Sequence, residues 1–585
     1  MRKQTKIAAI VSAAALLAIG ASMTSFAATG WQEEDGSWVY YNKNGEQVTD
    51  QWEKSGANWF YLGDDGVMAT DQLIEYNDNY YYVDANGAMV TDRWIAIDNE
   101  DAGDEDEPDV HWYYFQANGK ALKKGDSHEH IFKKTLPGGK TYAFDSEGRM
   151  LYGWVRYSDG ERQTGDTAWK EAEYYFGDEN DGAMSVGWRE IALTDDDAED
   201  AQPGDSFWDE DQVRWFYFKS SGKKENGSGN SDGVGSGKLN KKINGKKYGF
   251  DEYGRMIADW YAATPDEDLS KQDKYYASGS DAIHGKNLPS SKATNVDDYT
   301  RTFMYFSSPE DGARHSKSWF KVVPGYYQYL GKYEDGDDYW YYADGDGYLV
   351  TSEIKSIKGK KYAFDNKGRM KKGLQLMKVD GNDILDIIAD DDAGHPYDTE
   401  DDFKKTALWA KANEYYFYYF SNDEDHDGSM KTGNQTVTID GDNFTFKFKK
   451  SGTEKGQGEN AIDKDKHKVY MGGMLFKADK DDKVKILSVN GGVEALDVDD
   501  FLIKVKADKK QTGESSEKIE GAGGISVNVK KNSTYYKWTE DTTSKNYVLV
   551  NTSGAMVKSG SKKDGDGYKI VTDGKYGISL IVVED

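Results

Sequence analysis

Apolar and polar residues alternate in short runs along most of the chain, and the runs end in turn sequences rich in Asn, Asp and Gly. Near the start of the pattern the aromatic residues recur every 21 residues, as from Trp31 to Trp52. Short alternating runs joined by Asn-Gly or Asp-Gly turns are typical of β-hairpins. A short fixed period indicates one small unit that is copied and stacked. The pattern therefore predicts an all-β chain, a β-hairpin solenoid with a degenerate β region at its C-terminal end.

The regularity of the repeat changes along the chain, which predicts five regions. They are a signal peptide (1–27), regular 21-residue aromatic hairpin repeats (28–122), longer degenerate repeats with acidic insertions (123–435), a Lys- and Asp-rich β region (436–534) and a terminal hairpin repeat (535–585). Solvated loops are expected at the acidic insertions 98–109, 194–211 and 389–403 and at the Gly- and Ser-rich segment 225–237. Helical turns are expected only within 166–176 and 403–414.

The first residues have the pattern of a secretory signal peptide. A basic start is followed by an apolar run from Ile7 to Ile19 and by small residues that end at Ala27. The apolar run is shorter than the roughly 20 residues that a membrane-spanning helix needs. We therefore expect a secreted protein of the cell wall or cell surface, with no transmembrane segment.

Charge and cysteine content exclude several classes of function. The formal net charge is −30, so a nucleic-acid partner is not expected, because phosphate binding requires Lys and Arg patches. The chain has no cysteine, which excludes thiol catalysis and cysteine-ligated metals. An acidic protein attracts cations, and a polymer that carries quaternary ammonium groups would suit it.

The repeated aromatic residues suggest binding surfaces. In a strand, residues i and i+2 share a face, so Trp38 and Tyr40 point to the same side, as do Trp59 and Tyr61. If Trp52 closes over Trp38, with Tyr61 as a third wall, three rings form an open box that suits a cation unable to hydrogen-bond. The same rings could instead form the core of a thin stack of hairpins, and both roles are compatible in one ring.

The repeat resembles the choline-binding repeat of Gram-positive surface proteins, on Gly30-Trp31 with Trp38-Val-Tyr40 and on Trp52 with Trp59-Phe-Tyr61. Units that begin at Gly139, Gly245 and Gly359 with the pattern Gly-Lys-x-Tyr-x-Phe-Asp resemble related cell-wall-binding repeats. The resemblance implies a left-handed β-solenoid that holds choline of teichoic acids between successive hairpins. The ring positions that it implies are Trp38, Trp52, Tyr61, Trp59, Tyr82, Tyr80, Trp94 and Tyr114.

Some positions depart from the family pattern. Leu73 stands where the family has Trp, Tyr80 replaces Trp in the third hairpin, and Asp50, Asp71 and Asp92 replace a glycine. A glucan or another wall glycan therefore remains an alternative ligand, because flat rings also stack on sugars.

Other motifs do not predict chemistry. Asp423, Asp425 and Asp427 begin like a calcium loop, but Asn434 stands where Glu would complete it. His128 and His130 share a strand face without an identifiable third metal ligand, and Gly235-Ser-Gly237-Lys238 lacks the spacing of a phosphate loop. No pair of carboxylates stands out for glycoside hydrolysis. We expect no catalytic residue, no metal and no cofactor.

The expected function is non-covalent attachment to the cell wall, with the choline of teichoic acid or a wall glycan as partner. One alternative is a glucan-binding adhesin or scaffold that contacts a host or surface protein. A second alternative is a cell-wall hydrolase whose catalytic part lies in 436–534.

Overall fold

The structure is a computed structural model. It describes residues 29–103, 107–193, 213–227, 239–261, 303–325, 328, 330–422, 427–463, 465–521, 524–538 and 546–584. The predicted signal peptide, the insertion 194–211 and the segment Gly235 to Lys238 lie outside these residues. Within them the chain forms two compact units, and we describe each by itself. Unit 1 comprises residues 29–193, 213–226 and 253–255, and unit 2 comprises the others.

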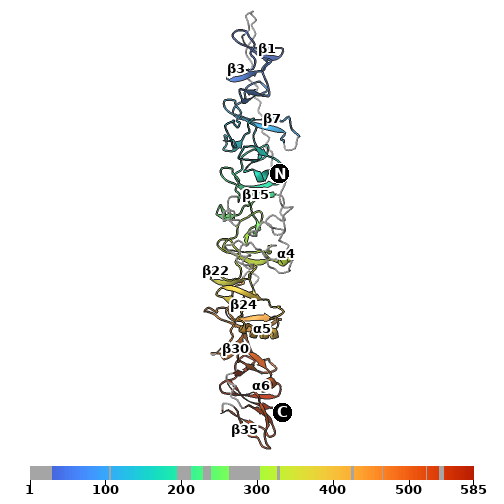
Figure 1. The fold of residues 1–585 in the computed structure, drawn as a ribbon, viewed down its shortest axis with the longest axis vertical. Coiled ribbons are helices and arrows are strands. Elements are labelled where there is room, and N and C mark those ends of the chain that lie inside the picture. The colour runs from blue at the N-terminus through green and yellow to red at the C-terminus, as the bar shows by residue number, and fades with distance from the viewer. Residues whose placement is uncertain are drawn as a thin grey trace. The chain divides into compact units, whose positions relative to one another are not determined.

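Unit 1 is a succession of antiparallel hairpins (Figure 1). The hairpin pairs are β1 (Gly30–Glu34) with β2 (Ser37–Tyr41), β3 (Gln51–Ser55) with β4 (Asn58–Leu62), β5 (Gln72–Tyr76) with β6 (Asn79–Val83), β7 (Arg93–Asp98) with β8 (Val110–Phe115), β9 (Lys133–Thr135) with β10 (Thr141–Ala143), β11 (Gly153–Val155) with β13 (Tyr174–Phe176) and β14 (Gly187–Ala192) with β15 (Val213–Phe218). Between β11 and β13 lie β12 (Arg162–Gln163) and α1 (Ala168–Glu171).

Unit 2 begins with the same kind of hairpin. Its first pairs are β16 (Lys241–Ile243) with β17 (Lys246–Tyr248), β18 (Asp259–Tyr261) with β19 (Met304–Phe306), β20 (Ser318–Val322) with β21 (Tyr339–Ala343), β22 (Glu353–Ile357) with β23 (Lys360–Phe364), β24 (Gly373–Asp380) with β26 (Tyr416–Phe420) and β27 (Gly433–Ile439) with β28 (Asp442–Phe448). The intervening elements are α4 (Leu330–Asp335), β25 (Asp383–Ile388) and α5 (Glu400–Ala412).

Backbone hydrogen bonds join each hairpin to the next. The amide of Met68, after β4, donates to the carbonyl of Trp38 in β2 at 2.8 Å. The amide of Met89 donates to Trp59 in the same way, also at 2.8 Å. In unit 2 the amide of Met370 donates to Trp340, again at 2.8 Å. Consecutive hairpins therefore stack in each unit, and the predicted all-β class of repeated hairpins is confirmed.

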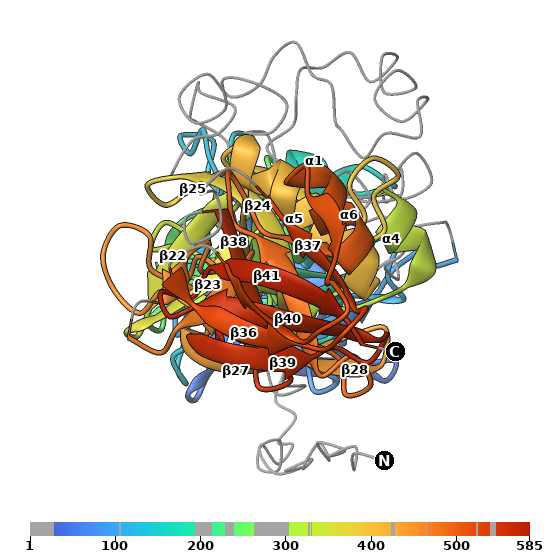
Figure 2. The same cartoon turned by 90° about the horizontal axis from the view of Figure 1, so that it is seen from below.

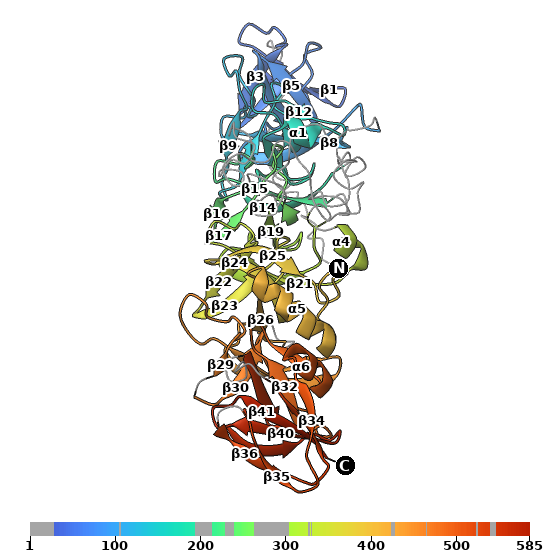
Figure 3. The same ribbon diagram turned by 60° about the horizontal axis from the view of Figure 1, so that its bottom comes forward.

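The longer repeats are the same hairpin with an insertion between its two strands. β24 pairs with β26 although β25 and α5 lie between them in sequence (Figure 3). α1 lies within the segment 166–176, where a helical turn was expected, whereas α5 begins at Glu400, three residues before the expected segment 403–414. The helices at Leu330–Asp335 and Val498–Lys504 were not expected. α5 also takes up the end of the acidic segment 389–403, in which Tyr397 and Phe403 are buried, so this insertion is not simply a solvated loop.

The C-terminal part of unit 2 is more compact than a row of hairpins. After β28 follow β29 (Ile462–Asp463), β30 (Lys468–Met471), β31 (Met474–Leu475), β32 (Val484–Ser488), β33 (Glu494–Leu496), α6 (Val498–Lys504), β34 (Asp508–Gln511), β35 (Glu517–Glu520), β36 (Ser526–Val529), β37 (Thr534–Lys537), β38 (Tyr547–Asn551), β39 (Ser559–Lys563), β40 (Tyr568–Asp573) and β41 (Ile578–Val583). β38 pairs with β32, and β34 joins the sheet β34-β37-β41-β40-β39. Figure 2 shows the strands β37, β41, β40 and β39 of this sheet. The predicted regions 436–534 and 535–585 therefore share their sheets.

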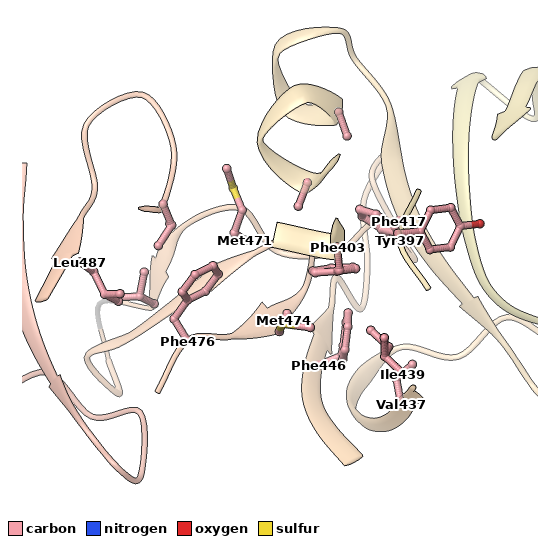
Figure 4. Close-up of a cluster of buried hydrophobic side chains, with 14 of the residues drawn as sticks. Tyr397, Phe403, Phe417, Val437, Ile439, Phe446, Met471, Met474, Phe476 and Leu487 are labelled. Carbon is pink, nitrogen blue, oxygen red and sulfur yellow. The ribbon is translucent and has the colours of Figure 1, made fainter. Parts of the chain in front are cut away.

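A continuous apolar core supports this part of unit 2. Phe403 of α5 packs against Phe417 of β26, with ring centroids 4.5 Å apart, and against Phe446 of β28 at 5.3 Å (Figure 4). Met471 and Met474 are buried in the same cluster. The helix of the insertion thus covers the hairpins on both sides of it. Among the described residues, no helix is both long enough and apolar enough to span a membrane.

Candidate ligand-binding junctions

Aromatic rings meet wherever one hairpin of unit 1 stacks on the next. Trp52 of β3 lies opposite Tyr61 of β4, with ring centroids 5.2 Å apart. The next hairpin adds Tyr81, 5.1 Å from Trp52. The preceding junction repeats this arrangement with Trp31, Tyr40 and Phe60. The ring centroids of Tyr40 and of Phe60 each lie 5.3 Å from that of Trp31. Each junction therefore contains a cross-strand Trp–Tyr pair and at least one ring from the following hairpin.

The third ring at each junction was not among the predicted site residues. Phe60 and Tyr81 are the middle residues of their aromatic runs, so they face the opposite side from their neighbours at i−1 and i+1. That side is the one that the preceding hairpin covers. The signal that could have found them is the aromatic residue in the middle of each run. Trp38 has no ring contact within the described part of the chain, and it is half-buried.

Two further predicted ring positions, Trp94 and Tyr114, are also in contact, with ring centroids 5.3 Å apart across β7 and β8. Two rings of the next hairpin cover Trp94, namely Tyr142 at 4.9 Å and Phe144 at 5.8 Å. At Trp52 the next hairpin likewise supplies a second ring, Tyr76, which contacts Tyr61 at 5.9 Å.

Two of the predicted rings already lie near a lysine. The ammonium group of Lys54 is 5.7 Å from the ring centroid of Trp59, whose side chain is 40% exposed. The ammonium group of Lys123 is 5.2 Å from the ring of Tyr80. At these two rings a protein cation has the position that a ligand cation would take.

The junction at Leu73 differs from its neighbours. Leu73 lies opposite Tyr82, where the two flanking hairpins have Trp52 and Trp94, and it packs in a cluster with Tyr80 and Tyr113. The hydroxyl of Tyr82 donates to Asp71 at 2.6 Å. Burial and this hydrogen bond raise the pKa of Tyr82 well above its ordinary value. The aspartate that replaces glycine here has φ +49°, in the left-handed region that Asp tolerates better than most residues.

The electrostatic environment at Trp52 favours a cation. Burial raises the pKa of the Tyr61 hydroxyl, and the carboxylates of Asp50 and Asp64 raise the pKa further. A negative potential that disfavours ionisation of a phenol also attracts a positive ligand.

Some junctions are closed by protein side chains. In unit 2, Trp260 is 8% exposed and is surrounded by Phe303, Tyr305, Phe320 and Tyr341, the last with its ring centroid 5.1 Å away. Its indole N–H donates to the carbonyl of Val323 at 2.8 Å. Rings at this junction serve as core, as the alternative interpretation of the aromatic pattern expected.

The motifs with metal-like spacing are in other contacts. Asp427 accepts hydrogen bonds from Lys360 and Lys431, both at 3.2 Å, and a hydrogen bond from Ser429 contributes most to lowering its pKa. Asp423 and Asp425 lie outside the described residues. His130 stacks on Tyr157, whereas His128 contacts Phe132. Among the described residues, no group of three or more His, Asp or Glu is placed to hold a metal ion.

In the region 436–534, the carboxylate with the most perturbed pKa forms an ion pair. Asp463 accepts a hydrogen bond from Lys447 at 2.9 Å, and this bond, with those from backbone amides, lowers the pKa of Asp463 to about 2. A carboxyl group held ionised in this way is unsuited to act as a general acid.

Comparisons with known proteins agree with the N-terminal repeats. Residues 28–63 and 49–94 match the family model described as choline-binding repeat. A comparison with proteins of curated function finds no match. Among solved structures, choline binding protein F from Streptococcus pneumoniae is 16% identical over 74% of this chain and 98% of its own, with a TM-score of 0.29.

The modular autolysin LytC from Streptococcus pneumoniae is 16% identical over 60% of this chain, with a TM-score of 0.28. This chain spans 55% of the length of that autolysin structure. The choline binding domain of Spr1274 from Streptococcus pneumoniae is 25% identical over 16% of this chain and 95% of its own, with a TM-score of 0.12. The segment that matches the choline-binding repeat model, residues 28–94, contains Trp38, Trp52 and Tyr61.

Proposed function

We propose that this protein is exported by its N-terminal signal peptide and attaches non-covalently to a cell wall by binding choline groups of wall polymers. The binding sites are the junctions between hairpins of residues 28–122, formed by the eight rings expected from the sequence. The observation that carries the proposal is the Trp52–Tyr61 pair, which lies within the matched choline-binding repeats and in the negative potential of Asp50 and Asp64.

At the Trp52 junction the cation rests on the outer faces of the rings. Trp52 already contacts both Tyr61 and Tyr81 at just over 5 Å, so no ligand fits between Trp52 and either tyrosine. Trp52 is half-buried, and Trp38 of the preceding hairpin is half-buried without a ring partner in the described structure. A trimethylammonium group that bridges Trp38 and Trp52 gains cation–π attraction from both, about 0.5–2 kcal/mol for each good contact.

Single sites of this strength are weak, and the repeats compensate by number. Linked sites on one chain bind a polymer that carries many choline groups with an avidity about 10²-fold or more above that of one site. Attachment to a wall requires this kind of multiple engagement and no catalytic residue.

The experiment is a choline titration of the mature chain, residues 28–585, followed by tryptophan fluorescence. We expect a saturable response at millimolar choline and a smaller, weaker response for Trp52→Ala. Trp52→Phe keeps an aromatic face and serves as the matched control, so its response should lie between the two. Circular dichroism confirms that each variant is folded.

Two results would overturn the proposal. One is the absence of any fluorescence response up to tens of millimolar choline. The other is a Trp52→Ala variant that is folded and still responds like the wild type. In either case the rings act only as core between hairpins.

A further inference from the structure

In unit 2, β18 and β20 each place a tryptophan opposite a tyrosine, whereas the β24–β26 hairpin has the tyrosine without the tryptophan. Trp319 pairs with Tyr342 and Trp260 pairs with Tyr305, but Leu374 of β24 pairs with Tyr419 of β26. Gly373 has φ +71°, as the glycines before Trp154 and Trp188 also have positive φ, so the backbone at this position is that of the other repeats. Leu fills less space than Trp, and volume is left beside the ring of Tyr419.

A cavity of about 380 Å³ lies beside Leu374 and Tyr419. Its lining comes from Leu374 and Tyr419, from the segment 437–440 of the next hairpin and from the polar side chains of Asp398 and Asn422. A second cavity of about 730 Å³ adjoins it and shares Gln375, Asp390 and Tyr397 with it. Together they form a groove, and both volumes are in the range of ligand sites.

The groups that line the groove are mixed donors and acceptors. Asn366 and Lys371 supply donors in the larger cavity, where the carboxylates of Asp383 and Asp390 are exposed acceptors. Asp386 accepts a hydrogen bond from Tyr415 at 2.7 Å and is thereby fixed at the rim. Both signs of charge are present, so neither a polyanion nor a simple cation is favoured by charge alone.

The groove offers a ligand one aromatic ring face from Tyr419. Tyr419 stacks on Phe448 with an interplanar angle of 15° and ring centroids 6.1 Å apart, which occupies one side of its ring. The tyrosine is half-buried and lines the smaller cavity. A choline box needs several ring walls, whereas a sugar ring needs one flat apolar face together with polar groups that pair with its hydroxyls.

We propose that the groove from Leu374 and Tyr419 to Asp383 and Asp390 binds a neutral oligosaccharide, with one sugar ring stacked on Tyr419. Asp390, which belongs to both cavities, accepts hydrogen bonds from sugar hydroxyls in the middle of the groove. The site is separate in sequence from the choline-binding repeats of residues 28–94 and does not depend on their function.

The test is isothermal titration of the full mature chain with two neutral probes, chitohexaose and isomaltohexaose. We expect one of the two to bind at a single site. Leu374→Trp rebuilds the cross-strand pair that β18 and β20 form and fills the smaller cavity, so it should weaken binding by roughly tenfold or more. Asp390→Asn should weaken binding by roughly three- to tenfold, because a hydroxyl loses its charged acceptor.

Asp479→Asn is the matched control, since Asp479 is exposed and does not line the groove. It should bind the probe like the wild type, and all variants should keep the choline response of Trp52. If neither oligosaccharide binds the wild type, or if folded Leu374→Trp and Asp390→Asn both bind as the wild type does, the proposal fails. Should Leu374→Trp not fold, the exposed substitution Asp390→Asn decides alone.

Discussion

Single lysines determine which aromatic rings are available to a ligand. The ammonium group of Lys54 is 5.7 Å from the ring centroid of Trp59, although this ring is 40% exposed and lies in the matched repeats. An exposed cation–π contact is worth about 0.5–1 kcal/mol, and a choline that takes this place must first displace the lysine.

We therefore expect Lys54→Gln to strengthen choline binding to the N-terminal repeats by about two- to fivefold. The measurement is the choline titration by tryptophan fluorescence. Lys43→Gln removes the same charge from an exposed turn of the first hairpin and is the control for general electrostatics. Equal gains in the two variants would show that charge alone, and not access to Trp59, governs the affinity.

At the residue scale the sequence predicted ring contacts within one hairpin better than groups of rings that come from successive hairpins. The sequence placed Trp52, Tyr61 and Trp38 in one box. Of these rings, Trp52 and Tyr61 are in contact across their hairpin, because cross-strand partners follow from the turn between them, whereas Trp38 has no ring contact among the described residues. The sequence also indicated Trp94 and Tyr114 as single ring positions, and these two are cross-strand partners. It missed Phe60 and Tyr81, because the face-sharing rule considers one hairpin at a time. Which side of a strand the preceding hairpin covers depends on stacking, and no local pattern encodes that.

At the element scale the stacking depends on a contact between a methionine and a glycine. The Met68 side chain, which follows β4, lies against Gly87 in the turn after β6, and a Cβ at Gly87 would be 2.7 Å from Met68 Cε. Gly87 has φ +75°, a conformation that residues with a Cβ adopt at a cost. The same relation recurs between Met89 and Gly119. The repeated Gly-x-Met pattern therefore holds neighbouring hairpins together.

Gly87→Ala should destabilise unit 1 by about 2–5 kcal/mol, the sum of left-handed backbone strain of about 1–2 kcal/mol and overpacking of about 1–3 kcal/mol. Gly36→Ala is the matched control. Gly36 has φ +82° but nothing within 4 Å of a Cβ, so only the backbone strain should appear. Urea unfolding measures both, and equal losses would show that the methionine contact contributes nothing.

The sequence also predicted elements unevenly. Hairpins with a short turn were evident, since both strands and the turn lie within one period. Strand pairs that are separated by an insertion were not predicted. β32 and β38 pair across the residues 489–546, and β34 joins β37 and β41 in one sheet. Pairing over such separations depends on tertiary packing, as in the apolar cluster around Phe501 and Trp538. The groove at Leu374 was missed as well, although aligning Gly373-Leu374 with Gly30-Trp31 would have shown the missing ring.

At the scale of the whole molecule, salt weakens binding by net charge more than binding by the aromatic sites. A chain of net charge −30 adsorbs to any cationic matrix, and this attraction is screened when the Debye length falls to about 3 Å at 1 M salt. Cation–π contacts at the hairpin junctions act over shorter distances and are partly shielded from solvent, so salt weakens them less. Retention on a matrix that carries trimethylammonium groups separates the two effects.

We expect the mature chain to stay on trimethylammonium-cellulose when it is washed with 1 M sodium chloride and to elute with choline chloride of the same concentration. The two washes screen charge equally, but only choline competes for the rings. Trp52→Ala combined with Trp94→Ala removes a ring from two junctions, and because linked sites multiply their effects, this variant should elute at clearly lower salt. If sodium chloride elutes the wild type as readily as choline chloride does, net charge and not the aromatic junctions accounts for retention.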